Sequence, residues 1–109
     1  MEINVRKEKV TTIVSVAGRM DALTSPEFEK ELSALISAGD SNFLINLQQL
    51  EYISSAGLRS ILFISRQLKN RNGVLLFAGP QGPVKDVFKI SGFNSIFKIF
   101  DTEEEALNA

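Results

Sequence analysis

Apolar and polar residues alternate at the start of the chain and then give way to a denser apolar run. Ile3 and Val5 alternate with polar neighbours, and residues 13–17 are mostly apolar. Period-two alternation followed by a short apolar run is typical of paired β-strands. We therefore expect a hairpin that turns within residues 7–11, with Gly18 ending its second strand.

A helix is predicted next, because apolar positions now recur every three or four residues. Thr24 or Ser25 is the candidate N-cap, and Pro26 suits the first helical turn. Glu27 stands three residues after Thr24, as in a capping box. Gly39 is the expected end. The predicted buried face carries Phe28, Leu32, Leu35 and Ile36.

The remaining pattern continues to alternate between strands and helices. It predicts, in chain order, a strand over 43–47, a helix over 58–68, a turn at 72–73, a strand over 74–78, a short helix from Pro83 closed near Gly92, a strand over 96–100 and a helix starting near 101. The order ββαβαβαβα predicts a single α/β domain over 1–109, with a mixed, mostly parallel sheet and helices packed against it. Five phenylalanines are expected in or near the core, at positions 77, 88, 93, 97 and 100. Glu103–Glu105 is expected to be a solvated helix start with no specific role.

Composition excludes several classes of function. The chain has 109 residues, a net charge of −1 and neither histidine nor cysteine. Disulfides, thiolate chemistry and histidine catalysis are therefore excluded, and nothing points to nucleic acid as a partner. No apolar run approaches the roughly 20 residues of a membrane span, and residues 1–7 lack a signal-peptide core. We expect a cytoplasmic protein without direct membrane insertion.

Catalytic constellations are not visible in the sequence. There is no Ser–His–Asp set and no pair of carboxylates at a useful spacing, and residues 79–82 are too short and proline-rich for a phosphate-binding loop. A response-regulator receiver needs an aspartate near the end of the 43–47 strand, where Asn46 and Gln48 stand instead. We therefore expect neither enzymatic activity nor a cofactor.

The most informative segment is residues 53–58, Ile-Ser-Ser-Ala-Gly-Leu. It follows an apolar strand and opens an apolar-periodic helix, so two hydroxyls stand at a helix N-terminus. Unpaired backbone N–H groups and the helix dipole favour negative charge at such a place. Local sequence alone leaves two interpretations open, namely simple N-capping by Ser54 and a regulatory phosphosite at Ser55.

Three segments together resemble the STAS domain family, in particular its stand-alone anti-sigma factor antagonists. Residues 18–22, Gly-Arg-Met-Asp-Ala, are similar to the family's Gly-x-Leu/Met-Asp motif after the second strand. Residues 45–58 resemble its strand–loop–helix signature. Residues 91–97, Ser-Gly-Phe-Asn-Ser-Ile-Phe, resemble its Ser-Gly-Leu/Phe segment before the last strand. The resemblance covers essentially the whole chain and implies the STAS fold.

The resemblance also implies a phosphorylation-controlled binding switch. In the family, the unphosphorylated protein binds an anti-sigma factor that is also a serine kinase of the GHKL ATPase type, and a separate phosphatase resets the switch. ATP and magnesium belong to that kinase. Alignment on Gly57 places the phosphorylated serine at Ser55. Here Ser54 replaces the usual aspartate and Ala56 the second hydroxyl, which removes a carboxylate that could orient the acceptor.

The residues implied in partner binding are Asp21, Ser54, Ser55, Ala56, Gly57 and Arg59. Asp21 also fits a plain turn or cap residue, and Arg59 also fits a solvated helix face. Gly57 is expected to let a partner approach the backbone closely. The missing aspartate motivates an alternative function, a non-phosphorylated STAS accessory or scaffold subunit of a larger assembly such as a lipid-transport complex.

Overall fold

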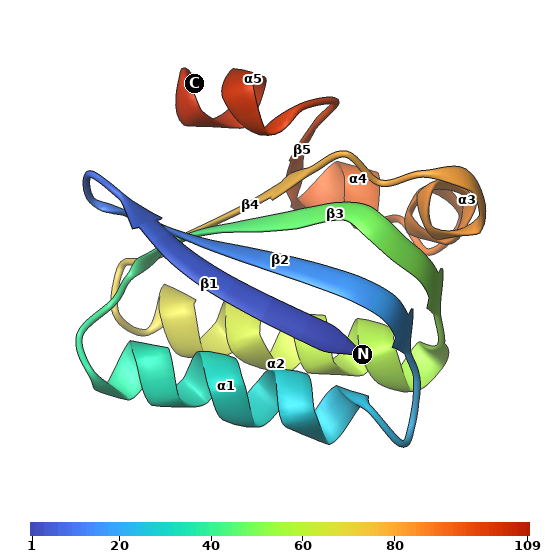
Figure 1. Cartoon of the computed structure of the whole chain (residues 1–109), viewed down its shortest axis with the longest axis horizontal. Helices are drawn as coiled ribbons and strands as arrows, with labels where there is room; N and C mark the ends of the chain where they lie inside the picture. The colour runs from blue at the N-terminus through green and yellow to red at the C-terminus, as the bar shows by residue number, and fades with distance from the viewer.

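A five-stranded sheet forms the centre of the molecule, with helices on both of its faces (Figure 1). The computed structural model describes residues 1–109. The spatial order is β1-β2-β3-β4-β5, in which β1 is antiparallel to β2 and all other neighbours are parallel. The strands are β1 (Glu2–Glu8), β2 (Thr11–Met20), β3 (Asn42–Ile53), β4 (Val74–Ala78) and β5 (Lys98–Phe100).

Two long helices lie side by side on one face of the sheet, and the C-terminal helix lies on the other (Figure 1). The helices are α1 (Ser25–Ser37), α2 (Ser55–Lys69), α3 (Gly82–Ile90), α4 (Phe93–Ile96) and α5 (Glu103–Leu107). The predicted mixed, mostly parallel α/β fold is therefore confirmed. One element is added to the predicted order, the one-turn helix α4 between α3 and β5.

Alternation along the strands divides the apolar residues between two clusters. In β3, Phe43, Ile45 and Leu47 belong to the main core with α1, α2 and α3, whereas Leu44 belongs to a smaller cluster with Ala106 of α5. Successive side chains of a strand point to opposite faces, so a nearly continuous apolar run implies cover on both sides. The five phenylalanines lie as expected, with those at 77, 88 and 93 buried and those at 97 and 100 half-buried.

Two predicted strand ends were too early. Gly18 does not end β2, because the strand runs on to Met20 through a register shift next to that glycine, whose φ is +94°. Likewise β3 continues past Leu47 to Ile53. The two extensions pair with each other, so their backbone groups are satisfied even where the side chains are polar. Hydrophobic pattern alone does not report this pairing.

The predicted strand over 96–100 was also too long at its start. Ile96 ends α4, Phe97 is the extended residue after it, and only Lys98–Phe100 pairs with β4. Phe97 nevertheless packs into the core, with its ring centroid 5.2 Å from those of Phe77 and Phe93. Burial of this ring produces the strand-like apolar pattern without requiring a strand.

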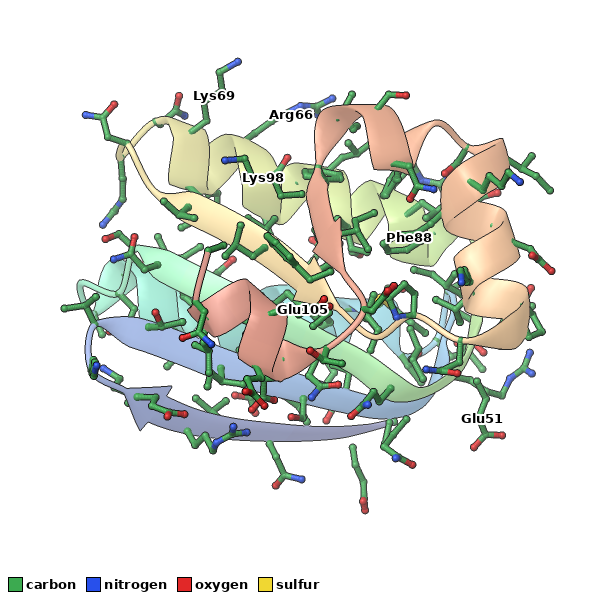
Figure 2. All side chains as sticks on the ribbon, turned by 90° about the horizontal axis from the view of Figure 1, so that it is seen from above. Glu51, Arg66, Lys69, Phe88, Lys98 and Glu105 are labelled. Atoms are coloured by element: carbon green, nitrogen blue, oxygen red, sulfur yellow. The ribbon has the colours of Figure 1, made fainter.

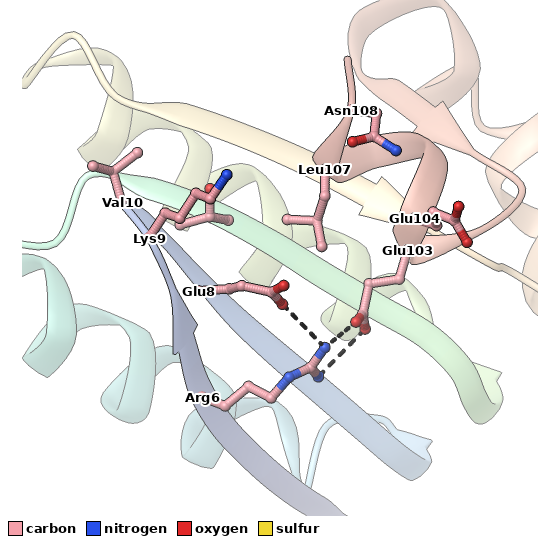
Figure 3. A pocket seen from close by; sticks show the side chains of 9 residues that line it. Arg6, Glu8, Lys9, Val10, Glu103, Glu104, Leu107 and Asn108 are labelled. Carbon is pink, nitrogen blue, oxygen red and sulfur yellow. Dashed lines mark hydrogen bonds and ion pairs between the residues drawn. The ribbon is translucent and has the colours of Figure 1, made fainter.

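The expectation that Glu103–Glu105 has no specific role is wrong for Glu103. Its carboxylate pairs with the guanidinium of Arg6 on β1, which also lies 3.8 Å from a carboxylate oxygen of Glu8 (Figure 3). The side-chain amide of Asn46 donates to Glu103 as well, at 2.7 Å. The hydrogen bond from Arg6 lowers the pKa of Glu103 and, with the bond from Asn46, outweighs the opposing effect of burial. These contacts hold the start of α5 to the sheet.

Candidate functional site

The ends of β2 and β3 place two chain segments next to each other at one edge of the sheet. Met20 pairs with Ile53, and the N–H of Ser54 donates to the carbonyl oxygen of Met20 at 2.9 Å. Each strand then leads into a helix, β2 through residues 21–24 into α1 and β3 through Ser54 into α2 (Figure 1). The structure therefore brings the predicted Asp21 segment and the predicted serine segment to the same edge.

Ser54 is the N-cap of α2, as predicted. Its backbone is extended, with φ −97° and ψ 176°, and its hydroxyl oxygen accepts a hydrogen bond from the N–H of Gly57 at 3.3 Å. Its carbonyl accepts the first helical bond, from the N–H of Leu58 at 3.0 Å. This is the geometry that favours Ser, Asp and Asn at the N-cap. The hydroxyl of Ser54 is therefore already occupied by a structural hydrogen bond.

Ser55 is the first residue of α2 and its side chain is exposed. Its hydroxyl makes no hydrogen bond within the protein, and the backbone N–H groups of Ser55 and Ala56 have no acceptor. Ala56 is half-buried. A free hydroxyl therefore stands beside two free N–H donors at the positive end of a 15-residue helix. The surroundings can accept a phosphate without breaking an existing bond.

Gly57 is buried against its own chain. A Cβ at this position would lie 2.6 Å from Cγ1 of Ile53 and 2.9 Å from the carbonyl oxygen of Met20. A glycine is therefore needed for α2 to start this close to the ends of both strands. The sequence analysis expected Gly57 to let a partner approach the backbone closely, and that role stays a prediction.

Asp21 organises the turn that precedes α1. Its carboxylate accepts hydrogen bonds from the N–H groups of Leu23 at 3.0 Å and Thr24 at 3.2 Å. Partial desolvation raises the pKa of Asp21, but these bonds, the hydroxyl of Thr24 and the charge of Arg19 together hold it below its usual value. The turn role expected for Asp21 is confirmed, and its role in partner binding stays a prediction.

The predicted capping box at α1 is not formed. Thr24 is the N-cap, but its hydroxyl makes no capping bond to the helix. Instead it donates to the carbonyl oxygen of Arg19 at 2.8 Å and accepts from the N–H of Asp21 at 2.9 Å. The hydroxyl of Thr24 is therefore bonded to the end of β2 and not to α1, and the local sequence does not reveal this contact.

Sequence reasoning missed three residues at this edge. The guanidinium carbon of Arg19 lies 4.1 Å from the ring centroid of Tyr52, and its Nε is 3.7 Å from Asp21. Arg19 and Tyr52 are paired across β2 and β3, so only the register of these strands brings them together. Leu23, 90% exposed in the turn after Asp21, is a large apolar side chain in solvent.

Arg59 lies one helical turn after Ser55 on the exposed surface of α2, and no carboxylate pairs with it. The edge therefore presents a free hydroxyl, an apolar side chain, one carboxylate and two arginines. No group of three or more Asp or Glu residues is arranged to hold a metal ion. No helix is both long and apolar enough to cross a membrane. The exposed groups at this edge are suited to contact with another protein, and the free hydroxyl of Ser55 can carry an added charge.

Comparisons with known proteins find relatives that match nearly the whole chain. The STAS domain model matches residues 2–106. A Bordetella bronchiseptica protein named as an anti-sigma factor antagonist, BtrV, is 34% identical over 109 residues, covering 100% of this chain and 94% of its own. The Staphylococcus aureus anti-sigma-B factor antagonist is 25% identical over 91 residues, covering 84% of each chain.

Solved structures share the fold. The phosphorylated form of the Bacillus cell fate determinant SpoIIAA has a TM-score of 0.77 and 22% identity, covering 98% of this chain and 97% of its own. The coverage is nearly complete on both sides, as it is for the Bordetella relative, so the likeness concerns a whole domain. The chain belongs to the STAS domain family.

Proposed function

We propose that this protein is an anti-sigma factor antagonist whose binding is switched by phosphorylation of Ser55. It acts by binding and not by catalysis. Support comes from the relatives, which are named as anti-sigma factor antagonists over nearly the full length of this chain. The observation that carries the proposal is the exposed, unbonded hydroxyl of Ser55 at the start of α2.

The proposed partner is an anti-sigma factor that is also an ATP-dependent serine kinase of the GHKL type. The unphosphorylated edge, with Asp21, residues 54–57 and Arg59, binds this partner and so frees its sigma factor. The kinase then transfers a phosphoryl group from ATP to Oγ of Ser55, and a serine phosphatase removes it. Because this cycle of phosphorylation and dephosphorylation uses ATP and controls a sigma factor, we propose that the protein acts in the cytoplasm.

The switch follows from where the phosphate would lie. Phosphorylation adds about 1.5–2 negative charges. In the free protein, the two free N–H groups and the helix dipole accommodate this charge, so the fold is retained. In a closed interface the same charge must lose its water, which weakens binding. A loss of 10–100-fold corresponds to only about 1.4–2.8 kcal/mol.

Ser54 in place of the family's aspartate is compatible with this proposal. Serine and aspartate are equally good N-caps, and Ser54 makes the capping bond here. What the replacement removes is a second negative charge next to Ser55. The phosphate would therefore be the only strong anionic group on the first turn of α2, which carries no acidic residue.

Phosphopeptide mass spectrometry tests the proposal directly. The protein is incubated with ATP and extract of its native cells, alongside the S55A variant. Cleavage after Lys30 and Arg59 gives one peptide with five serines, at 33, 37, 41, 54 and 55, so fragment ions must place the phosphate. We expect phosphate on Ser55 in the native protein and none on this peptide in S55A.

An unmodified Ser55, in an extract that phosphorylates another known serine substrate, would contradict the switch. It would favour the second candidate, a non-phosphorylated accessory or scaffold subunit such as that of a lipid-transport complex. The specific observation behind that candidate is the serine at position 54, which leaves no carboxylate beside the hydroxyl to help a kinase bind magnesium.

A further inference from the structure

Carboxylates are absent from a long central part of the chain. Residues 52–85 contain no Asp or Glu, and all 13 acidic residues lie outside this segment. The same segment carries five cationic residues, at positions 59, 66, 69, 71 and 85. The net charge of the chain is only −1, but its charges are therefore distributed very unevenly along the sequence. In the folded protein, this produces a surface with cations and no carboxylates.

An apolar groove lies between the C-terminal half of α2 and α4. It has a volume of about 310 Å³ and its floor includes Leu75 of β4. Its other apolar lining residues are Leu62, Leu68, Ile96 and Phe97. Ile96 is 61% exposed, although it stands beside buried Phe93. A large aliphatic side chain held over an apolar groove in this way is available to a partner.

The groove has a positive rim without a negative counterpart. Lys69 lines it, and Arg66 lies on the adjacent exposed turn of α2. The three elements that line the groove, α2, β4 and α4, contain no carboxylate, and none of their cations is in a salt bridge. Figure 2 shows Arg66, Lys69 and Lys98 along one side of the molecule.

We infer that this groove is a second docking surface, for an acidic amphipathic segment of a partner protein. The apolar side chains of the partner segment would fill the space between Leu62 and Ile96, and the carboxylates of the segment would face Arg66 and Lys69. Charge complementarity selects the occupant, because a basic or neutral apolar segment would leave these cations unpaired at the rim. The groove lies well away from the phosphosite, since Lys69 is 14 residues along α2 from Ser55, about 21 Å at 1.5 Å per residue.

NMR titration tests the inference with a defined probe. ¹⁵N-labelled protein is titrated with the acetylated, amidated peptide Glu-Glu-Leu-Leu-Glu-Glu-Leu-Leu-Glu and, separately, with its analogue carrying Lys in place of every Glu. We expect the acidic peptide to shift amides of α2 residues 62–69, of β4 and of α4, and the basic peptide to leave them unmoved. Binding should weaken as salt rises from about 0.01 M to 0.15 M, where the Debye length falls from about 30 Å to about 8 Å.

Matched variants assign the effect to the groove. I96D should weaken binding of the acidic peptide by about tenfold or more, the loss typical of an interface anchor. The control V10D also replaces an exposed aliphatic residue with aspartate, at a 79% exposed position in the β1–β2 turn, and should bind like the native protein. K69E should weaken binding too, whereas K30E on the exposed side of α1 should not.

Three results would overturn the inference. The first is equal binding of the acidic and basic peptides. The second is a set of shifts outside the groove that I96D and K69E leave unchanged. The third is self-association of the native protein in sedimentation that I96D abolishes, because the groove would then be an interface between copies of this chain.

Discussion

The side-chain amide of Asn46 donates to the carboxylate of Glu103 at 2.7 Å, joining β3 to α5 across 57 residues of sequence. The amide oxygen of Asn46 in turn accepts from the N–H of Gln48 at 2.9 Å. Arg6 of β1 forms an ion pair with the same carboxylate. One carboxylate thus fastens the last helix over the apolar cluster that contains Leu44 and Ala106.

This network predicts an acid-sensitive part of the stability. The pKa of Glu103 lies below its ordinary value of 4.5 in the folded protein, chiefly because of the hydrogen bond from Arg6. A lowered folded-state pKa contributes stability that is present above about pH 4.5 and is lost as pH falls through the folded value. Between pH 6 and pH 3, the native protein should therefore lose about 0.5–1 kcal/mol more than E103Q, measured by urea unfolding. E104Q is the control, because it changes an exposed and unpaired neighbour, and it should lose as much stability as the native protein. If E103Q also lost as much unfolding free energy as the native protein between pH 6 and pH 3, the role of this carboxylate would be contradicted.

The cap at Ser54 predicts a rescue pattern. S54A should lower the free energy of unfolding by about 1 kcal/mol, because the N–H of Gly57 loses its acceptor. S54D should restore most of it, since aspartate caps as well and its charge suits the helix N-terminus. S55A is the matched control and should change little, because the hydroxyl of Ser55 makes no hydrogen bond. Chemical denaturation of the three variants measures this, and equal losses in S54A and S55A would show that capping is not what distinguishes the two serines.

Gly57 predicts a substitution with opposing effects of unequal size. In G57A, alanine would gain up to about 1 kcal/mol from helix propensity. The new Cβ, however, would lie 2.6 Å from Ile53 and 2.9 Å from the carbonyl of Met20, so α2 must shift away from both strands. Overpacking of this kind costs about 1–3 kcal/mol, and we expect a net loss. A thermal unfolding midpoint of G57A at or above that of the native protein would disprove the close contact.

The proposed switch predicts that charge at Ser55 acts on binding and not on folding. S55D should bind the partner anti-sigma factor about tenfold or more weakly, a change of about 1.4 kcal/mol. Its free energy of unfolding should stay within about 0.5 kcal/mol of the native value, as for most surface substitutions. S37D adds the same charge at an exposed serine near the end of α1 and should bind normally. Isothermal titration calorimetry measures all three proteins, and native-like binding by S55D would count against charge exclusion.

Much of the fold is predictable because local patterns report local structure. Pro26 and Gly39 mark the limits of α1, and Ser54 marks the start of α2, because capping depends on neighbours within a few residues. The two strand ends that were predicted too early have a common cause. The ends of β2 and β3 lie beyond Gly18 and Leu47 because each strand satisfies the backbone of the other, which is a contact between segments over 30 residues apart.

The sequence by itself determined the α/β class of the protein and the position of the helix N-terminus that carries Ser54 and Ser55. Alternating strands and helices indicated an α/β domain, and residues 53–58 indicated a helix N-terminus carrying two hydroxyls, since both signals repeat within a few residues. Only the tertiary structure decided which hydroxyl is free, why Gly57 is glycine, and how Arg19 meets Tyr52 and Glu103 meets Asn46. Each of these depends on the register of strands and the distance between elements, and these are set by packing of the whole core.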